Sequence, residues 1–414
     1  MNIKRNISAH FKIICYLSLL VFLTNCKSKE TQGKGGFASD VAFMQDYVDV
    51  IQLSDPSGNG KVAVSAALQG RVMTSSSSGD EGQSYGWINK ELFKSKDTLD
   101  HINVFGGEER FWIGPEGGQY SLFFTKGVDF NLDNWYTPKL LDLDHFDVKE
   151  VNKTSATFTK NASLTNYSGF KFDIGIERKI EVLSSDATFK ALGIEPISGL
   201  NSVAYQSTNT LTNTGNADWK KETGLLSIWL LGMFNPSPET TIMIPYVKGD
   251  SITLGKIVND YFGKVPAERL IVNEGIIYFK GDGKFRSKIG LSPKRATDIL
   301  GSYDAKNHVL TVVNHSQEAG VTDYVNSKWE LQDKPFSGDV INAYNDGPPE
   351  PGKKPLGPFY EMESSSPALA LKVGESGLHT QLTCHFEGDP AKLDQIARKL
   401  FGISLEDLDK IFKK

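Results

Sequence analysis

The chain has 414 residues, with 45 basic and 50 acidic side chains and a formal net charge of −5. An acidic balance disfavours nucleic acid as a partner, because nucleic-acid binding rewards a basic face. The length is sufficient for a sizeable hydrophobic core, and no apolar run beyond the N-terminal region is long enough for a membrane-spanning helix.

Residues 1–25 have the pattern of a secretory signal peptide. The segment Met1–Lys12 is basic and holds no acid, and Ile13–Leu23 is almost wholly apolar. This apolar run is too short to span a bilayer, which takes about 20 residues, so a cleaved signal is expected. The segment Leu23–Cys26 resembles a bacterial lipobox, which predicts a lipid anchor on Cys26. An ordinary cleaved signal is the alternative.

The segment after the signal indicates where the protein resides. Residues 26–36, rich in Lys and Gly, are expected to form a flexible tether. A lipid on Cys26 predicts a location in the cell envelope of a Gram-negative bacterium, anchored to the outer membrane on its periplasmic or surface side. With Cys15 removed and Cys26 lipidated, only Cys384 remains, so no intramolecular disulfide is expected.

Residues 37–388 are expected to form one β domain. Short alternating segments such as Lys61–Leu68, Phe170–Ile176 and Leu270–Lys280 are rich in Val, Ile, Thr, Tyr and Phe. They are separated by Gly, Asn, Asp, Ser and Pro, the usual turn residues. Helical periodicity is scarce between them, which favours an all-β sandwich or barrel over a parallel α/β sheet. No repeat of fixed period supports a propeller or a solenoid.

Residues 389–414 predict two short helices packed on the β domain. Asp389 before Pro390 is a typical helix start, and apolar residues then recur at helical spacing up to Gly402. Ser404 with Asp407 is close to a capping box and predicts the start of the second helix. The apolar stripes are short, and they suit a core contact better than a membrane surface.

The strand that holds Tyr360, Glu361 and Glu363 is the first candidate site. Residues two apart on a strand point to the same face, about 6.6 Å apart along the backbone. Two partly buried carboxylates at that spacing raise one pKa and leave an acid beside a base, which suits proton transfer on a sugar hydroxyl or a glycosidic bond. A solvated strand face is the alternative.

The loop before this strand is proline-rich and begins at Asn342. Asp346 lies in its Asn-Asp-Gly-Pro turn. Loops held rigid beside a strand often carry binding groups, so this loop is expected to form the rim of a groove. We therefore expect Asp346 and Tyr360 to bind substrate, and Glu361 and Glu363 to be catalytic.

Two further segments carry side chains that suit sugars. Arg110 offers a rigid fork of donors and Trp112 an apolar face, and Glu116 follows in a glycine-rich loop. Lys288 shares a strand face with Arg286, and a cation there suits sugar hydroxyls or an acidic sugar. We expect Arg110, Trp112, Glu116 and Lys288 to bind substrate. The alternative is that Trp112 belongs to the core and the charges are solvated.

His379 and His385 share one face of an alternating strand, about 20 Å apart if the strand is straight, so they cannot bind one metal ion. His385 is a candidate general acid near the glutamates, with a hydrogen-bonded surface residue as the alternative. Cys384 lies on the opposite face and is expected in the core. The sequence holds no motif for a metal or a phosphate, so no metal or cofactor is expected.

Several segments together resemble a family of uncharacterised bacterial secreted proteins related to the galactose mutarotases. They are Phe105–Phe124, Gln206–Trp229, Gly281–Pro293 and Asp339–Asp389. The resemblance implies an all-β, galactose mutarotase-like β-supersandwich, in which two large curved antiparallel sheets form a sugar-sized groove, and it implies a carbohydrate ligand. Mutarotases use a glutamate on a late strand followed by a proline, as Pro367 follows Glu361 and Glu363 here. A fold alone does not define a reaction.

The leading functional hypothesis is a lipid-anchored, carbohydrate-active protein that binds a sugar in a concave groove. A mutarotase- or epimerase-like enzyme and a glycoside-processing enzyme both fit the paired glutamates. The alternative is a non-catalytic carbohydrate-binding lipoprotein of the envelope. A third hypothesis is a structural envelope protein whose C-terminal helices dock a partner, which an exposed apolar stripe would favour.

Overall fold

The computed structural model describes residues 36–413. The predicted signal peptide, Cys26 and nearly all of the predicted tether lie outside these residues. No helix within residues 36–413 is long and apolar enough to cross a membrane. Cys384 is buried with a free thiol, as its place on an apolar strand face predicts.

Ten antiparallel strands form the larger sheet, and the long strands β19, β8 and β7 are neighbours in it. From one edge to the other the strands are β12 (Leu270–Asn273), β13 (Ile276–Lys280), β10 (Thr240–Pro245), β15 (Ile299–Asp304), β16 (Val309–His315), β19 (Ser376–Glu387), β8 (Asn201–Asn213), β7 (Lys171–Val182), β6 (Ser155–Thr165) and β5 (Asp147–Val151).

A six-stranded antiparallel sheet forms the second layer. Its order is β11 (Ile257–Val258), β14 (Ser287–Leu291), β17 (Ile341–Asn345), β18 (Tyr360–Ser365), β9 (Ser227–Phe234) and β4 (Arg110–Gly114). A separate three-stranded sheet contains β1 (Ile51–Ser54), β2 (Lys61–Ser65) and β3 (Arg71–Ser76). The order places β18, which carries both candidate glutamates, near the middle of the six-stranded sheet.

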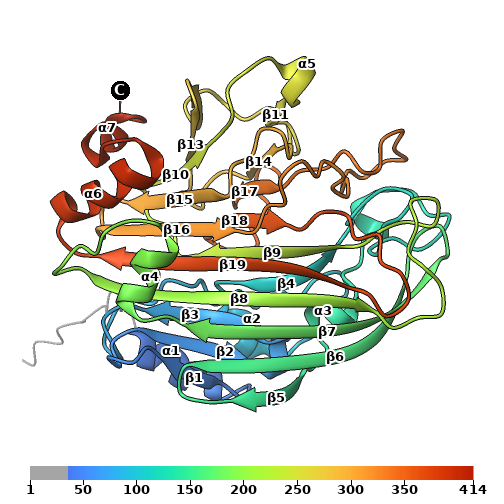
Figure 1. The fold of residues 1–414 in the computed structure, drawn as a ribbon, viewed down its shortest axis with the longest axis horizontal. Coiled ribbons are helices and arrows are strands. Elements are labelled where there is room, and N and C mark those ends of the chain that lie inside the picture. The colour runs from blue at the N-terminus through green and yellow to red at the C-terminus, as the bar shows by residue number, and fades with distance from the viewer. Residues whose placement is uncertain (1–35, 414) are drawn as a thin grey trace, which may run out of the picture. The chain divides into compact units, whose positions relative to one another are not determined.

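The two large sheets stack face to face, and they overlie one another in the view of Figure 1. Ile289, Ala343 and Met362 of the six-stranded sheet join Ile242 and Leu300 of the ten-stranded sheet in one buried cluster. On the six-stranded sheet these apolar side chains are next to Lys288, Asn342, Glu361 and Glu363, so strand alternation turns the apolar face to the interior and the polar face outward. The predicted all-β sandwich is confirmed.

Polar side chains also lie between the sheets. On β19, His379, Gln381 and His385 point inward, and all three are buried. Ser364 of β18 lies 2.8 Å from His379 Nε2 and donates to Gln381 Oε1 at 2.7 Å. The sandwich interior is therefore part apolar and part hydrogen-bonded, with both sheets contributing to the polar part.

Short helices cover the ends and the outer face of the sheets. They are α1 (Phe37–Gln45), α2 (Lys90–Ser95), α3 (Lys139–Asp142), α4 (Ser185–Ala191), α5 (Ser251–Leu254), α6 (Pro390–Phe401) and α7 (Leu405–Lys410), with 3-10 turns at Ala66–Leu68 and Leu132–Asn134. The predicted C-terminal helices are confirmed, and Asp389 caps α6 by accepting from Ala391 N at 2.9 Å. Helices α6 and α7 pack on the outward side chains of β19, among them Cys384 and Phe386.

Helix α1 was not expected, because the β region was predicted to begin at Phe37. Phe37, Val41 and Met44 are its buried apolar residues. They recur at the spacing of one helical face, a signal that is present in the sequence. They pack with Ala63 and Met73 of the three-stranded sheet, so the chain reaches its first strand only at Ile51.

Candidate functional site

The candidate glutamates lie on the outer face of the six-stranded sheet, opposite to the face that meets the ten-stranded sheet. Directly paired residues on neighbouring antiparallel strands share a face. Glu361 pairs with Tyr344 and Met233, and Glu363 pairs with Asn342 and Leu231. Lys288 pairs with Tyr344, Arg110 with Leu231, and Trp112 with Trp229. Strand register thus brings Arg110, Trp112, Lys288, Glu361 and Glu363 to one surface.

Two buried ion pairs connect these side chains. Arg110 Nη2 pairs with Glu361 Oε1, with side chains 5% and 8% exposed. Lys288 Nζ lies 2.9 Å from Glu363 Oε2, with side chains 14% and 0% exposed. The indole N–H of Trp229 donates to the same Glu363 oxygen at 2.9 Å. Each glutamate therefore has its own cation, and Glu363 has an additional neutral donor.

Burial and neighbouring charges shift the pKa values of Glu361 and Lys288. Burial raises the pKa of Glu361 to about 8, although Arg110 opposes the rise and Glu363 adds to it. Burial alone would lower the pKa of Lys288, but Glu363 and then Glu116 outweigh it, so the pKa of Lys288 is raised. A carboxyl that holds its proton near neutral pH can donate it, which is the requirement for a general acid.

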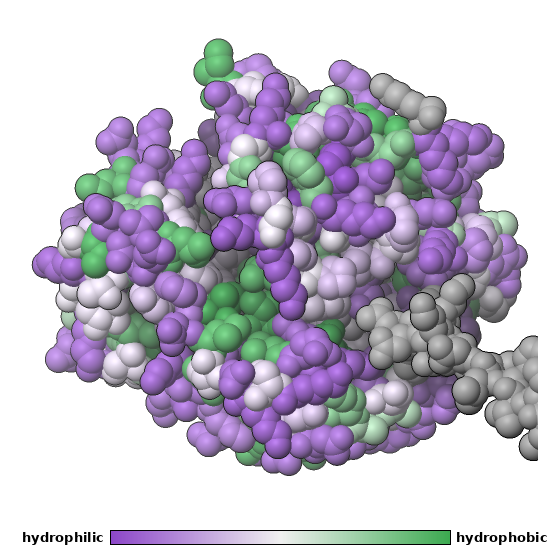
Figure 2. All heavy atoms as spheres, turned by 180° about the vertical axis from the view of Figure 1, so that it is seen from behind, coloured by the Kyte–Doolittle hydropathy of each residue, from purple (hydrophilic) through white to green (hydrophobic). Residues whose placement is uncertain are grey.

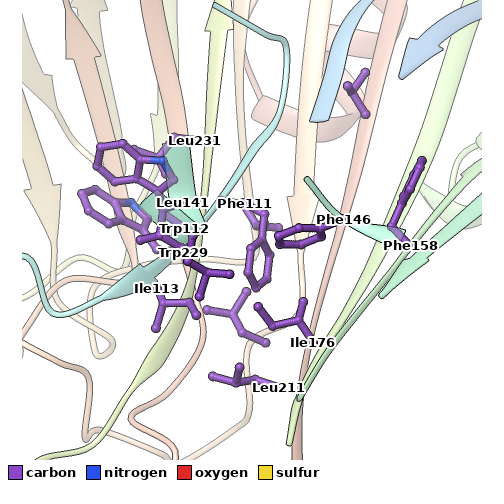
Figure 3. Packing of buried hydrophobic residues seen from close by; sticks show 14 of the residues in the cluster. Phe111, Trp112, Ile113, Leu141, Phe146, Phe158, Ile176, Leu211, Trp229 and Leu231 are labelled. Carbon is purple, nitrogen blue, oxygen red and sulfur yellow. The ribbon is translucent and has the colours of Figure 1, made fainter. Parts of the chain in front are cut away.

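Tryptophans form the apolar part of the same face. Trp112 and Trp229 lie together in Figure 3, whereas Phe111 points toward Phe146 on the other side of the strand. The two indole rings are 5.5 Å apart and nearly perpendicular, at 83°. The Arg110 guanidinium lies 5.1 Å from the Trp112 ring, and Lys288 Nζ lies 5.0 Å from the Trp229 ring. Trp112 is thus both a packing residue and a wall of the candidate site.

Glu116 and Asp339 add two more carboxylates. Glu116 Oε1 accepts from the indole N–H of Trp329 at 3.2 Å, and Asp339 accepts from the Tyr261 hydroxyl. Burial raises the pKa of Glu116 and of Asp339, and Lys288 partly offsets both rises. We call Arg110, Glu116, Lys288, Asp339, Glu361 and Glu363 the carboxylate cluster.

Gly290 makes room for one end of this cluster. It lies two residues after Lys288 on β14 and pairs with Asn342. A Cβ at this position would overlap Asp339 Oδ2 and would come within 2.6 Å of Asn342 Nδ2 and of the Tyr261 hydroxyl. A side chain at residue 290 would therefore displace the Asp339–Tyr261 hydrogen bond.

Three buried polar atoms of this face have no hydrogen-bond partner within residues 36–413. They are the Glu363 Oε1, Arg110 Nε and Trp112 Nε1 atoms. Buried polar atoms in folded proteins are normally satisfied, because leaving one unpaired costs about 1–3 kcal/mol. One acceptor and two donors beside the tryptophans are thus unpaired, and all three atoms are closed to solvent.

His385 does not belong to this face, so the expectation that it lies near the glutamates is wrong. It points into the sandwich, fully buried. Its Nε2 lies 2.6 Å from Glu108 Oε1 and its Nδ1 2.9 Å from Thr311 Oγ1, while its ring stacks on Tyr85. His385 is hydrogen-bonded as its alternative expected, but it lies in the interior and not at the surface.

Tyr360 also points the wrong way for a substrate-binding residue. It precedes Glu361 on β18, so its side chain lies on the interior face. There its hydroxyl is 2.8 Å from Ser302 Oγ of β15, and its ring packs 5.5 Å from that of Phe234. The expectation that Tyr360 binds substrate is therefore wrong, because strand alternation turns its side chain away from the face that carries Glu361 and Glu363.

Asp346 lies at the border of the cluster. It accepts from the Tyr344 hydroxyl at 2.8 Å and from the Gly357 backbone N–H at 2.8 Å. Burial raises its pKa. Asp346 thus joins the proline-rich loop to β17, and its charge also raises the pKa of Glu361.

Several neighbours of the glutamates carry no signal in the sequence that would place them at this site. Trp229 and Asn342 lie on the neighbouring strands, whose pairing is not visible in the sequence. Tyr261, Trp329 and Asp339 come from or next to irregular segments that carry no periodic signal. Tyr261 lies just after β11, and its ring is 5.8 Å from Lys288 Nζ.

Residues 36–413 contain no group of three or more His, Cys, Asp or Glu side chains arranged to hold a metal ion. The cluster's carboxylates are instead engaged by cations and by indole and phenol donors. The contacts of these carboxylates are therefore those of a largely buried, hydrogen-bonded and charge-paired cluster.

The model of a family of unknown function, DUF6786, matches residues 35–412. The chain belongs to the DUF6786 family. A search of curated proteins finds no match to this chain. The predicted relation to an uncharacterised family is thereby confirmed.

Solved structures with a similar fold cover most of this DUF6786 chain. A proposed aldose 1-epimerase from Escherichia coli K12 is 13% identical, with a TM-score of 0.47, and the match covers 82% of this chain and 99% of that one. A galactose mutarotase-like protein from Lactobacillus casei ATCC 334 is 13% identical, with a TM-score of 0.45 and the same coverage. A galactose mutarotase related enzyme from Lactobacillus acidophilus is 9% identical, with a TM-score of 0.45, covering 82% and 98%.

At these identities and TM-scores the similarities assign no function to this chain. Function has to be argued from the site itself. In this DUF6786 protein the site offers a carboxyl with a raised pKa beside a second carboxylate, aromatic walls and unpartnered donors and acceptors. Such a set can bind a polyhydroxylated ligand and exchange protons with it.

Proposed function

We propose that the protein binds a sugar against the outer face of the six-stranded sheet. The unpartnered Glu363 Oε1, Arg110 Nε and Trp112 Nε1 atoms carry the proposal. Sugar hydroxyls donate and accept hydrogen bonds, so they suit one acceptor beside two donors. The C–H faces of a sugar ring suit the indole surfaces of Trp112 and Trp229, which are large and apolar.

The leading form of the proposal is an epimerase-like or glycoside-processing enzyme. Glu361 keeps its proton near neutral pH, since burial raises its pKa to about 8, and would act as the acid. Glu363 accepts from Lys288 and Trp229 through one oxygen, so its buried Oε1 is unpaired and would take a proton from a sugar hydroxyl or a water molecule that reaches it. An acid and a base on adjacent same-face positions of one strand suit both reaction classes.

The second form is a non-catalytic sugar-binding protein. Its support is that each glutamate is already paired with a cation, Glu361 with Arg110 and Glu363 with Lys288. Ion pairs of this kind hold carboxylates in fixed positions as hydrogen-bond acceptors, without any change of protonation. A carrier or sensor of sugars needs no more than that.

We place this activity in the envelope of a Gram-negative bacterium, with a lipid on Cys26 as the anchor. The support is the basic and apolar pattern of residues 1–25 and the Leu23–Cys26 segment before a Lys- and Gly-rich tether.

Calorimetric titration of the protein with a panel of neutral and acidic mono- and oligosaccharides tests the proposal. We expect at least one sugar to bind, and binding by none would overturn the proposal.

The variants Glu361→Gln and Glu363→Gln then separate the two forms of the proposal. If sugar turnover is seen and both variants lose it, the protein is an enzyme. If both variants bind and the wild type turns over nothing, it is a binding protein. Glu195→Gln, at an exposed position after α4, is the matched control.

A further inference from the structure

Arg286 is a cation at the edge of the candidate site that directly precedes β14, two residues before Lys288. Its guanidinium forms no hydrogen bond and no ion pair with another residue of the described range 36–413. Arg286 is partly exposed, and none of its nitrogens is among the buried unpartnered atoms of that range. Its N–H donors are therefore within reach of a ligand in solution, unlike those of Arg110, which is buried and paired with Glu361.

The ring of Phe262 supports this guanidinium. Arg286 Cζ lies 3.9 Å from the centre of the Phe262 ring, and Phe262 is 45% exposed. The Phe262 ring in turn meets the Tyr344 ring edge to face, with centroids 5.9 Å apart at 81°. A planar guanidinium that stacks on an aromatic ring keeps the donors in its own plane available. The stack therefore holds a fork of donors in a fixed orientation.

Tyr344 places this stack beside the carboxylate cluster. It is directly opposite Lys288 on one side and Glu361 on the other, so the three side chains share the outer face of the six-stranded sheet. Residues two apart on a strand are about 6.6 Å apart along the backbone. A ligand of one or two sugar rings that lies on the cluster can therefore contact Arg286 as well.

The side of the molecule that carries this face is open. Helix α4 packs on the outer face of the ten-stranded sheet and lies in front of the strands in Figure 1. Figure 2 shows the opposite side, where hydrophobic residues are visible near the middle between hydrophilic ones. That side thus exposes apolar and polar groups together, the two kinds of surface that a sugar contacts.

The acids around Arg286 offer little repulsion to an anion. Burial raises the pKa of Glu361 to about 8, so its carboxyl is mostly uncharged near neutral pH. Burial also raises the pKa of Asp346, the carboxyl on which the charge of Arg286 acts. Burial lowers the pKa of Lys288, but Glu363 and other carboxylates outweigh it, so Lys288 stays charged. An anionic group here meets cations and carboxyls that favour their neutral forms.

We propose that Arg286, stacked on Phe262, binds the anionic group of a sugar ligand, so that the site prefers sugars with a carboxylate or a phosphate over neutral ones. The proposal rests on the proposed function, because it names the ligand class of the same site. A guanidinium forms two parallel N–H···O hydrogen bonds with such a group, and these charge-assisted bonds are stronger than neutral ones. A neutral hydroxyl offers one oxygen and no charge.

Calorimetric titration with sugars that differ only at C6 tests this proposal. Glucose is compared with glucuronate and glucose 6-phosphate, and galactose with galacturonate and galactose 6-phosphate. At least one anionic sugar should bind at least tenfold more tightly than its neutral parent. The uronate and phosphate arms show which of the two anionic groups Arg286 binds.

Variants of the stack then test the role of Arg286. Arg286→Gln removes the charge and the fork, so it should weaken binding of the anionic sugar at least tenfold and that of the neutral parent less than twofold. Arg286→Lys keeps the charge without the fork, and Phe262→Leu removes the supporting ring, so each should narrow the preference severalfold. Arg398→Gln is the matched control, because Arg398 lies on α6 and pairs with Asp394. It should leave both affinities unchanged.

The outcomes separate this proposal from the proposed function. Neutral sugars that bind as tightly as their anionic partners, or more tightly, overturn the preference while sugar binding stands. A preference that Arg286→Gln leaves unchanged overturns the role of Arg286. Binding of no sugar of either kind overturns the proposed function and this proposal with it. Thermal unfolding shows whether each variant is folded, and Arg286→Lys and Phe262→Leu keep the test decisive if Arg286→Gln is not.

Discussion

Glu361 and Glu363 stand two residues apart on one strand face, yet their surroundings differ. Glu361 pairs with one cation, Arg110, but burial has the larger effect on the pKa of Glu361. Glu363 contacts Lys288 and the Trp229 indole through a single oxygen, and its other oxygen is buried without a hydrogen-bond partner. Different environments for neighbouring carboxyls are how a site obtains separate acid and base roles.

The raised pKa of Glu361 predicts a particular pH dependence of stability. Its pKa rises from an ordinary 4.5 to about 8 on folding. Between pH 4.5 and about pH 8 the folded protein therefore holds a proton on Glu361 that the unfolded chain has lost. The contribution of Glu361 is fully present below pH 4.5 and is lost as the pH rises through about 8. Relative to Glu361→Gln, the wild type should lose up to about 1.4 kcal/mol of unfolding free energy per pH unit across that window.

Urea unfolding of the wild type and of Glu361→Gln at several pH values between 4.5 and 8 measures this difference. If the Arg110 ion pair dominated instead, the pKa of Glu361 would be lowered on folding. The wild type would then gain stability over the variant as the pH rises from acid, and that opposite slope would contradict the assignment.

Gly290 offers a residue-scale test of the candidate site. In Gly290→Ala the new Cβ would meet the ends of the Asp339, Asn342 and Tyr261 side chains, and these can move without unfolding the sheet. We expect sugar binding about tenfold weaker, or ~1.4 kcal/mol, with a change in unfolding free energy below about 1.5 kcal/mol. Calorimetric titration and urea unfolding measure the two quantities.

The matched control is Gly215→Ala, whose added Cβ would approach no atom closer than 3.3 Å. It should bind sugar as the wild type does. Unchanged binding in Gly290→Ala would show that the Asp339–Tyr261 end of the cluster is not part of the sugar site.

At the scale of the element, β19 shows what alternation can and cannot predict. The sequence indicates correctly that His379, Gln381 and His385 share one face and that Cys384 and Phe386 share the other. Both faces are buried, the apolar one under α6 and α7 and the polar one inside the sandwich. A strand pattern does not reveal what covers a polar face, which is why His385 was expected at the site.

The inward face of β19 predicts that acid destabilises the protein. Burial, with a smaller effect from His315, lowers the pKa of His379 to about 3, well below its ordinary value of about 6.5. Between about pH 3 and pH 6.5 the unfolded chain therefore holds a proton on His379 that the folded protein does not. Stability associated with His379 is present above pH 6.5 and falls by up to about 1.4 kcal/mol per unit as the pH drops toward 3.

His379→Gln should remove this contribution, so the variant should lose less stability than the wild type between pH 6.5 and 4. Urea unfolding at matched pH values gives the comparison. His145→Gln, at an exposed position, should follow the wild type. Parallel curves for the wild type and His379→Gln would show that His379 keeps an ordinary pKa.

For the whole molecule, local patterns predicted the architecture and long-range pairing decided the site. Alternating β-branched and aromatic segments indicated an all-β sandwich, and the capping residues Asp389 and Gly402 indicated the final helices. Two-residue spacing correctly placed Glu361 and Glu363 on one face. Their cations come from β4 and β14, which are distant in the sequence. The order of strands in a sheet brings them together, and no local pattern encodes that order.

The last prediction concerns the attachment of the whole molecule to a membrane. The predicted anchor is Cys26, which precedes the described residues. If Cys26 carries lipid, Cys26→Ala should lose the incorporation of a labelled fatty acid and move from the membrane fraction to the soluble one. A single acyl chain binds membranes only marginally, whereas several chains anchor stably, so the shift should be nearly complete. Cys15→Ala, within the predicted signal, is the matched control and should stay labelled. A wild type that takes up no label and stays in the soluble fraction would leave an ordinary cleaved signal as the better interpretation of residues 1–25, and a labelled Cys26→Ala protein would show that the lipid is not on Cys26.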